Sequence, residues 1–251
     1  MSWLKYYEIF LREGLFPDHE SLSELLIYKD IALVHEIHGI SVELGCGIAR
    51  FSLILPLIVR GVNFVIGVDL EDRILIIAKK IFRKYHLYSQ ADFILADVRY
   101  IPLRDSSVEF VHSQGLYEHF EEPERSRVIN ESARILKRGG FMLCFVPNKL
   151  SIFYEILRRK EKLLSRIHHP LYEIPFTIKE ITIILNKTNI TIIERGGIVT
   201  NSLLVYLAYF LEKLGKKLNL SLFIKRIGIS RSKGLLGIIL GRQIYCLGVK
   251  R

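Results

Sequence analysis

The sequence predicts an α/β protein whose helices cover a mostly parallel β-sheet. Between residues 40 and 148, short apolar runs alternate with helical segments, and each run is followed by a glycine, aspartate, serine or proline. Strands that alternate with helices in this way form right-handed βαβ units with parallel strands. The chain has 251 residues, of which 50% are hydrophobic, so it can bury a core without disulfides or metal.

The expected strands are the apolar runs themselves. They cover residues 40–44, 62–68, 93–96, 108–112, 141–146, 190–194 and 243–249. The run at 141–146 contains no polar residue, which is typical of a strand that is buried on both faces of a parallel sheet.

The expected helices cover residues 3–11, 20–38, 49–60, 71–86, 121–137, 152–167, 177–187 and 202–218. Acidic residues open the segment 71–86 and basic residues close it, as the helix dipole favours. Pro56 should disturb the middle of its helix. Gly139-Gly140 should stop the helix before them, and Thr177 with Glu180 should form a capping box.

The net charge of +10 is concentrated in the last fifth of the chain. Residues 1–150 carry a net charge of −2, residues 151–200 carry +3, and residues 201–251 carry +9. The C-terminal part therefore suits an anionic partner.

The three cysteines, Cys46, Cys144 and Cys246, are far apart, so a disulfide framework or structural zinc site is not expected. Without an export signal or a spanning segment, we expect a cytoplasmic protein.

The strongest functional signal is the stretch from Val42 to Arg50, which reads Val-Glu-Leu-Gly-Cys-Gly-Ile-Ala-Arg. Its glycines allow a sharp turn and a close approach of the backbone to a ligand at the carboxyl end of the first strand. Asp69 and Asp97 follow the second and third strands. Three acidic residues, Glu43 included, should therefore line one crevice at the edge of the sheet.

These motifs resemble those of the class I S-adenosylmethionine-dependent methyltransferases, of the small-molecule type. The resemblance implies a Rossmann-like sheet of seven strands with helical cap insertions, and S-adenosylmethionine as cofactor. It implies that the glycine loop and Glu43 hold the methionine part, that Asp69 holds the ribose and that Asp97 holds the adenine. The implied cofactor-binding residues are Glu43, Gly45, Cys46, Gly47, Asp69, Leu70, Asp97, Val98, Ser113 and Gln114.

Two features separate the motif from a dinucleotide-binding loop. Arg50 stands where that fingerprint needs its third glycine. Glu43 would repel a pyrophosphate but attract the ammonium of a methionine. Within the methyltransferase pattern, Ala49 replaces a third glycine, and alanine excludes a positive φ unless strain is tolerated.

The acceptor is less closely defined. The residues after the fourth strand, Ser113-Gln114-Gly115-Leu116, lack the Asn/Asp-Pro-Pro-aromatic run common in enzymes that methylate exocyclic amines. Cys144 should be buried in a strand and inert, which disfavours covalent catalysis. His119 is the candidate general base, because an imidazole can take a proton at neutral pH. His168-His169 is expected to be a loop, and no metal is expected.

We expect a single domain over residues 1–251. Residues 39–149 form its cofactor-binding core, and residues 150–251 form the substrate and cap half, with the last strands. Helices at 1–38, 151–170 and 201–235 should form the cap.

The expected reaction is direct methyl transfer to a small-molecule or lipid-like, amphiphilic acceptor. Residues 201–251 could dock on an anionic membrane surface, which would place the protein peripherally there, or on RNA as an RNA methyltransferase. A non-catalytic cofactor-binding or scaffold protein is the remaining alternative. The acceptor molecule, the methylated atom and the oligomeric state stay open.

Overall fold

The computed structural model describes residues 28–31, 33–59, 61–151, 154–155, 173–199, 230–232, 238 and 241–251. The expected helices at 3–11 and 202–218, and nearly all of the helix at 152–167, lie outside these residues. Of the helix expected at 20–38, the described residues between 28 and 34 are helical.

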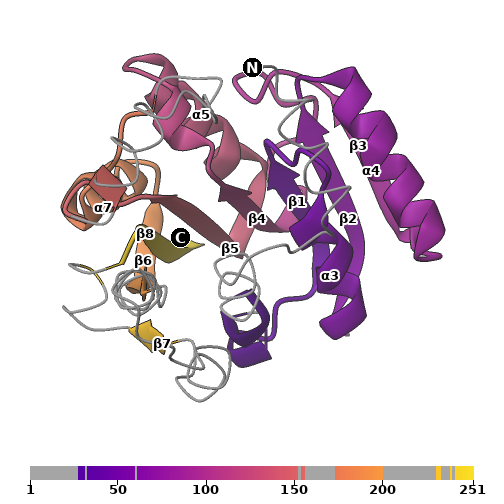
Figure 1. The fold of residues 1–251 in the computed structure, drawn as a ribbon, viewed down its shortest axis with the longest axis horizontal. Helices are drawn as coiled ribbons and strands as arrows, with labels where there is room; N and C mark the ends of the chain where they lie inside the picture. Colours follow the sequence, from indigo (N-terminus) through magenta and orange to yellow (C-terminus); the bar gives the residue numbers. More distant parts are fainter. Residues whose placement is uncertain are drawn as a thin grey trace, which may run out of the picture.

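A single mixed sheet forms the centre of the fold (Figure 1). Its strand order is β3-β2-β1-β4-β5-β8-β6-β7. The strands are β1 (Gly39–Leu44), β2 (Val62–Asp69), β3 (Ala91–Leu95), β4 (Val108–Gln114), β5 (Leu136–Pro147), β6 (Ile190–Val199), β7 (Ser230–Ser232) and β8 (Gln243–Lys250). Strands β1 to β5 pair in parallel, and β8 runs antiparallel between β5 and β6. The predicted Rossmann-like, mostly parallel sheet is therefore confirmed.

The sheet has one short strand more than the seven that were expected. Residues 230–232 lie in a segment expected to be helical, but they pair antiparallel with residues 197–199 of β6. Strand β6 is also longer than the expected 190–194. Its extension places Gly196 opposite Tyr245, where a Cβ would lie 2.8 Å from the tyrosine ring. A side chain at this position would clash, so glycine lets the two strands stay paired.

Helices cover both faces of the sheet (Figure 1). The helices are α3 (Arg50–Ile58), α4 (Asp72–Lys84), α5 (Glu124–Ile135) and α7 (Ile178–Asn186). Side chains of α3 and α4 share one apolar cluster, and side chains of α5 and α7 share the other. Strand β5 contributes Leu143 and Phe145 to the first cluster, and Met142 and Cys144 to the second. From residue 141 onward both faces of the strand are buried or nearly so, which explains the apolar sequence of that part.

The expected end of the helix at 121–137 is wrong. Helix α5 stops at Ile135, and the two glycines lie inside β5 instead. Leu136 pairs with Val108 and the next pair joins Phe141 to Phe110, so residues 137–140 form a bulge. Gly139 has a φ of 77°, which favours glycine in such a bulge.

Two other local predictions can be compared directly. The capping box of α7 is confirmed: the Thr177 hydroxyl accepts a hydrogen bond from the Glu180 amide (3.1 Å), and the Glu180 carboxylate accepts one from the Thr177 amide (2.7 Å). Helix α3 continues through Pro56 and ends two residues later, at Ile58. Pro56 therefore lies close to the end of α3 rather than dividing the helix.

Candidate active site

The loop after β1 turns through three residues with positive φ. Gly45 and Gly47 have φ values of 64° and 53°, and Ala49 has 54°. Helix α3 begins directly after Ala49, which is completely buried. A left-handed backbone costs alanine roughly 1–2 kcal/mol. The loop thus keeps the glycine-type turn despite the substitution, and the strain is tolerated.

Asp69 joins the second strand to the glycine loop of the first. Its Oδ2 accepts a hydrogen bond from the Gly47 amide (2.8 Å), and its Oδ1 accepts one from the Glu71 amide (3.0 Å). Burial raises the pKa of Asp69, and these backbone hydrogen bonds act in the opposite direction. The carboxylate is therefore fixed at the mouth of the loop.

Glu43 lies beneath the loop and is only 3% exposed. Its Oε2 accepts a hydrogen bond from the amide of Ser52, in the first turn of α3 (3.0 Å). Burial raises the pKa of Glu43 to about 7, while its hydrogen bonding with Ser52 acts in the opposite direction. In the structure Glu43 therefore ties β1 to the start of α3.

Asp97 forms a dense ion pair that the sequence analysis did not identify. Arg99 donates from Nε to both carboxylate oxygens (3.0 Å each) and from Nη2 to Oδ2 (2.6 Å). Its Nη1 also bonds Glu124 of α5 (3.1 Å). The hydrogen bond from Arg99 lowers the pKa of Asp97. Arg99, two residues beyond the predicted site residue, therefore holds that carboxylate in place and keeps it ionised.

The other predicted cofactor residues differ in exposure. Leu70 is 71% exposed beside Asp69, whereas Cys46 and Val98 are buried. Ser113 and Gln114 end β4, next to the end of β1 in the sheet. The structure therefore places the ten predicted residues at or just after the ends of β1, β2, β3 and β4. Cys46 and Cys144 are buried thiols whose pKa is raised, consistent with inert cysteines.

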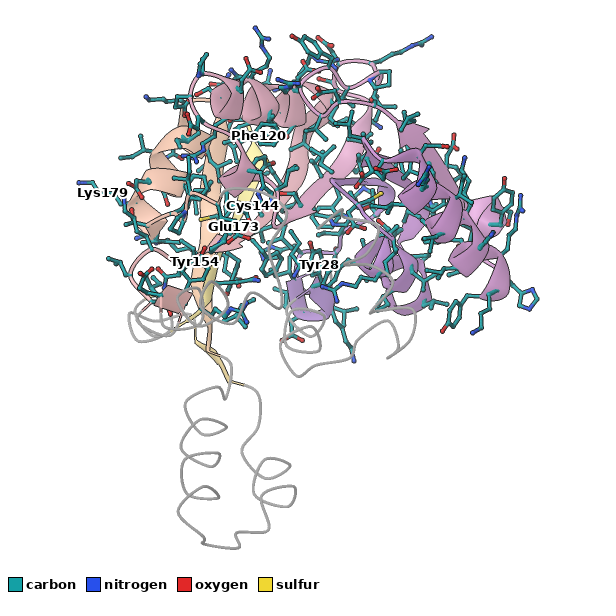
Figure 2. The ribbon with its side chains drawn as sticks, turned by 45° about the horizontal axis from the view of Figure 1, so that its top comes forward. Tyr28, Phe120, Cys144, Tyr154, Glu173 and Lys179 are labelled. Carbon is teal, nitrogen blue, oxygen red and sulfur yellow. The ribbon has the colours of Figure 1, made fainter. Side chains whose placement is uncertain are left out.

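His119 belongs to a second group of titratable side chains beyond β4. It ends the short 3-10 helix η2 (Tyr117–His119). Ligand atoms of Glu118, His119 and Glu173 all lie within 4.8 Å of one another. The Tyr154 hydroxyl donates to Glu173 Oε2 (2.7 Å), and Figure 2 shows these two side chains next to each other. Of this group, only His119 was predicted from the sequence as a site residue.

The backbone explains how Glu173 reaches η2. The Ile174 amide donates to the Glu118 carbonyl (2.8 Å), and the Phe176 amide donates to the Pro147 carbonyl (2.9 Å). The segment at 173–176 is therefore held along the ends of β4 and β5. His168, His169 and residues 200–229 lie outside the described residues.

Among the helices that the structure describes, none is long and apolar enough to cross a bilayer.

Comparison with known proteins bears on the part of the site that contains the glycine loop. Residues 42–144 match the family model described as a methyltransferase domain. No significant match was found among curated proteins.

Solved structures share the fold at low sequence identity. One is a protein from Galdieria sulphuraria provisionally described as a sarcosine dimethylglycine methyltransferase, with 15% identity, a TM-score of 0.63, and coverage of 92% of this chain and 86% of that one. Another is magnesium protoporphyrin IX methyltransferase from Synechocystis with bound SAH, at 14% identity and a TM-score of 0.61, covering 93% of this chain and 84% of that one.

The cyclase SpnF also has this fold, at 15% identity and a TM-score of 0.57, with 90% of this chain and 81% of that one covered. Similarity at this level shows the fold alone, so the match of residues 42–144 to the methyltransferase domain carries the assignment. That match covers the glycine loop, Asp69, Asp97 and the end of β4, which together form the site described above. The match therefore indicates a methyltransferase domain over residues 42–144, and together with the shared fold it supports an S-adenosylmethionine-dependent enzyme.

Proposed function

We propose that the protein transfers the methyl group of S-adenosylmethionine to a small-molecule acceptor by direct in-line displacement. The observation that carries this proposal is the hydrogen bond of Asp69 to Gly47, which joins an acidic strand end to a glycine loop. A loop held in this way presents backbone and carboxylate groups to a ligand without further ordering.

The charge of the site supports this cofactor. Glu43, Asp69 and Asp97 lie at the carboxyl ends of three adjacent parallel strands. Carboxylates so placed repel a phosphate-bearing cofactor. S-adenosylmethionine carries an ammonium, a sulfonium and a ribose but no phosphate, so the three acidic side chains suit this cofactor. Asp69 can accept from the ribose hydroxyls while it holds the loop, because each carboxylate oxygen accepts more than one hydrogen bond.

The remaining predicted residues would complete the cofactor site. The adenine would lie against Leu70 and Val98, with Asp97 accepting from its amino group. A 71% exposed leucine beside two carboxylates is apolar surface that a flat ring can cover. Cys46, Ser113 and Gln114 would line the path toward the reacting methyl group.

The enzyme would act mainly by proximity and orientation. Holding the two reactants in line can be worth ~7–11 kcal/mol. His119 would take the proton that the acceptor loses, since it lies in η2, directly after the carboxyl end of β4. Two of the structural relatives are named for small-molecule substrates, which agrees with a small acceptor.

The test is product formation. Untagged protein would be incubated with methyl-labelled S-adenosylmethionine and a panel of small amines, phenols and carboxylic acids. We expect methylated product from at least one acceptor class, with loss of product in Asp69→Ala. Tight cofactor binding without product across the panel would instead favour the non-catalytic alternative.

A further inference from the structure

Two carboxylates and an imidazole converge outside the proposed cofactor site. Ligand atoms of Glu118, His119 and Glu173 lie within 4.8 Å of one another. Two carboxylates at this separation repel each other unless they share a proton or hold a cation. The cluster is built from two distant segments, since η2 and residues 173–176 meet through the bond between Ile174 and Glu118.

Glu118 is the unusual member of the cluster. Its side chain is 2% exposed, and its Oε2 has no hydrogen-bond partner among the described residues. Burial is the main cause that raises its pKa, and Glu173 raises it further. Leaving a buried carboxyl oxygen unpaired costs roughly 1–3 kcal/mol. A ligand that pairs with this oxygen would recover that energy.

The arginine that attracts Glu118 does not satisfy this oxygen. Arg125 attracts Glu118 electrostatically and lowers its pKa. However, the Arg125 Nε donates to the Tyr117 carbonyl (3.3 Å), and its guanidinium lies over the Phe176 ring at 4.4 Å. Its Nη2 is itself buried without a hydrogen-bond partner among the described residues. One carboxyl oxygen of Glu118 is among the ligand atoms of the cluster, and Arg125 contacts Tyr117 and Phe176 instead.

The other carboxylate is already positioned by a neighbour. The Tyr154 hydroxyl donates to Glu173 Oε2 (2.7 Å), and the two side chains lie next to each other in Figure 2. Outer partners of this kind orient metal ligands, and their loss typically costs 10–100-fold in metal affinity. Tyr154 is itself buried, so the contact has little freedom.

We propose that Glu118, His119 and Glu173 form a binding site for a divalent transition-metal ion. One nitrogen and two carboxylate oxygens suit Mn²⁺ and Zn²⁺, whereas Ca²⁺ prefers six to eight oxygens and Cu(I) prefers sulfur. Three protein ligands leave further coordination positions open for water or another ligand. The sequence alone predicted no metal, because neither the three cysteines nor His168-His169 have the spacing of metal ligands.

Metal binding and the proposed base role of His119 exclude each other at one nitrogen. A neutral imidazole has a single lone pair, which can bind a metal or accept a proton but not both. A bound metal would therefore withdraw the base, and saturating Mn²⁺ should lower methyl transfer if His119 is that base. The site itself is tested by binding alone, so its failure is distinct from a failure of the proposed function.

The experiment uses the untagged full-length chain without cofactor. Mn²⁺ binding would be followed by electron paramagnetic resonance and Zn²⁺ binding by calorimetry. We expect saturable binding of about one ion per chain. Glu118→Gln and Glu173→Gln should each weaken it at least tenfold, and Tyr154→Phe should weaken it about tenfold.

Glu121→Gln is the matched control, since Glu121 is an exposed carboxylate close to η2 and outside the cluster. It should bind Mn²⁺ like the wild type. Thermal melting would establish that each variant is folded. If Glu118→Gln does not fold, Glu173→Gln still tests the site, because Glu173 is only half-buried. No saturable binding, or binding that both glutamate variants retain, would overturn the proposal.

Discussion

The carboxylates at this edge of the sheet form two groups that differ in their partners. The first half comprises Glu43, Asp69 and Asp97, and the second half comprises Glu118 and Glu173 with His119. At the ends of β1, β2 and β3, each predicted carboxylate already has a partner: Glu43 has the Ser52 amide, Asp69 has the Gly47 amide, and Asp97 has Arg99. Beyond β4, Glu118 is buried with an unpaired oxygen among the described residues. The first half is organised before any ligand arrives, whereas the second contains an unsatisfied group.

This difference follows from how each half is assembled. The carboxylates of the first half bond to residues between two and 22 positions away. The second half needs Glu173, which is brought to η2 by backbone hydrogen bonds across the sheet edge. Partners that are close in sequence satisfy the carboxylates of the first half, whereas the cluster built from distant segments leaves a buried carboxyl oxygen without a partner among the described residues. The predictions below test each half in turn.

The largest expected effect is the pH dependence of stability caused by Glu43. Its pKa is about 7 in the folded protein against an ordinary 4.5, so the folded state holds a proton that the unfolded state has released between these values. The free energy of unfolding must then fall as pH rises through this window. The loss from this group amounts to roughly 3 kcal/mol by pH 7. Glu43→Gln should not show it.

Urea unfolding of both proteins between pH 4 and 8, without cofactor, would measure this difference. We expect the variant to gain on the wild type as pH rises from about 4.5 to 7 and to keep a constant advantage above that. Glu121→Gln, at an exposed carboxyl, should follow the wild-type curve. Parallel curves for Glu43→Gln and wild type would show that Glu43 ionises normally.

His119→Ala tests the second half. If His119 takes the acceptor proton, turnover should fall by ~10²-fold while cofactor affinity stays within about twofold. Steady-state kinetics and calorimetry with S-adenosylhomocysteine would separate the two quantities. Wild-type turnover in a folded variant would remove His119 from the reaction.

Asp69→Ala tests the first half. The variant loses both the proposed ribose contact and the bond to Gly47, so S-adenosylmethionine should bind at least tenfold more weakly, or ~1.4 kcal/mol. Calorimetry would measure it, with Asp92→Ala as the control because Asp92 lies in β3 and its Oδ1 bonds only the next amide among the described residues. Unchanged affinity in Asp69→Ala would contradict its assignment.

The sequence could place the residues of the first half at one edge of the sheet because its signals are local. Gly45, Asp69 and Asp97 each follow a strand, so their common position needs no tertiary information, and their binding of the cofactor stays a prediction. Arg99 was missed although it is adjacent, because a basic residue in a loop has no pattern that distinguishes an ion pair from a solvated side chain. Glu173 was missed for a different reason: only the folded chain brings it to Glu118.

The secondary structure shows the same division. The capping box at Thr177 was predicted correctly because it depends on two residues three positions apart. The bulge at Gly139 was misread as a helix stop because a glycine pair is compatible with both, and the choice depends on pairing with β4. The β7 strand could not be predicted, since three residues gain strand geometry only from their pairing with β6.

The smallest expected effect concerns Ala49, the residue that departs from the glycine pattern. Glycine would relieve a left-handed strain of roughly 1–2 kcal/mol, but it would also lose a buried methyl worth ~0.8 kcal/mol and add unfolded-state entropy worth ~0.4–1 kcal/mol. These contributions nearly cancel, so Ala49→Gly should change the free energy of unfolding by less than about 1 kcal/mol and leave cofactor affinity intact. Ala49→Val should be destabilised by more than ~2 kcal/mol, because a β-branched side chain fits poorly at a φ of 54° in a fully buried turn. Urea unfolding of the three proteins would decide the point, and a valine variant as stable as wild type would mean that the loop does not need this turn.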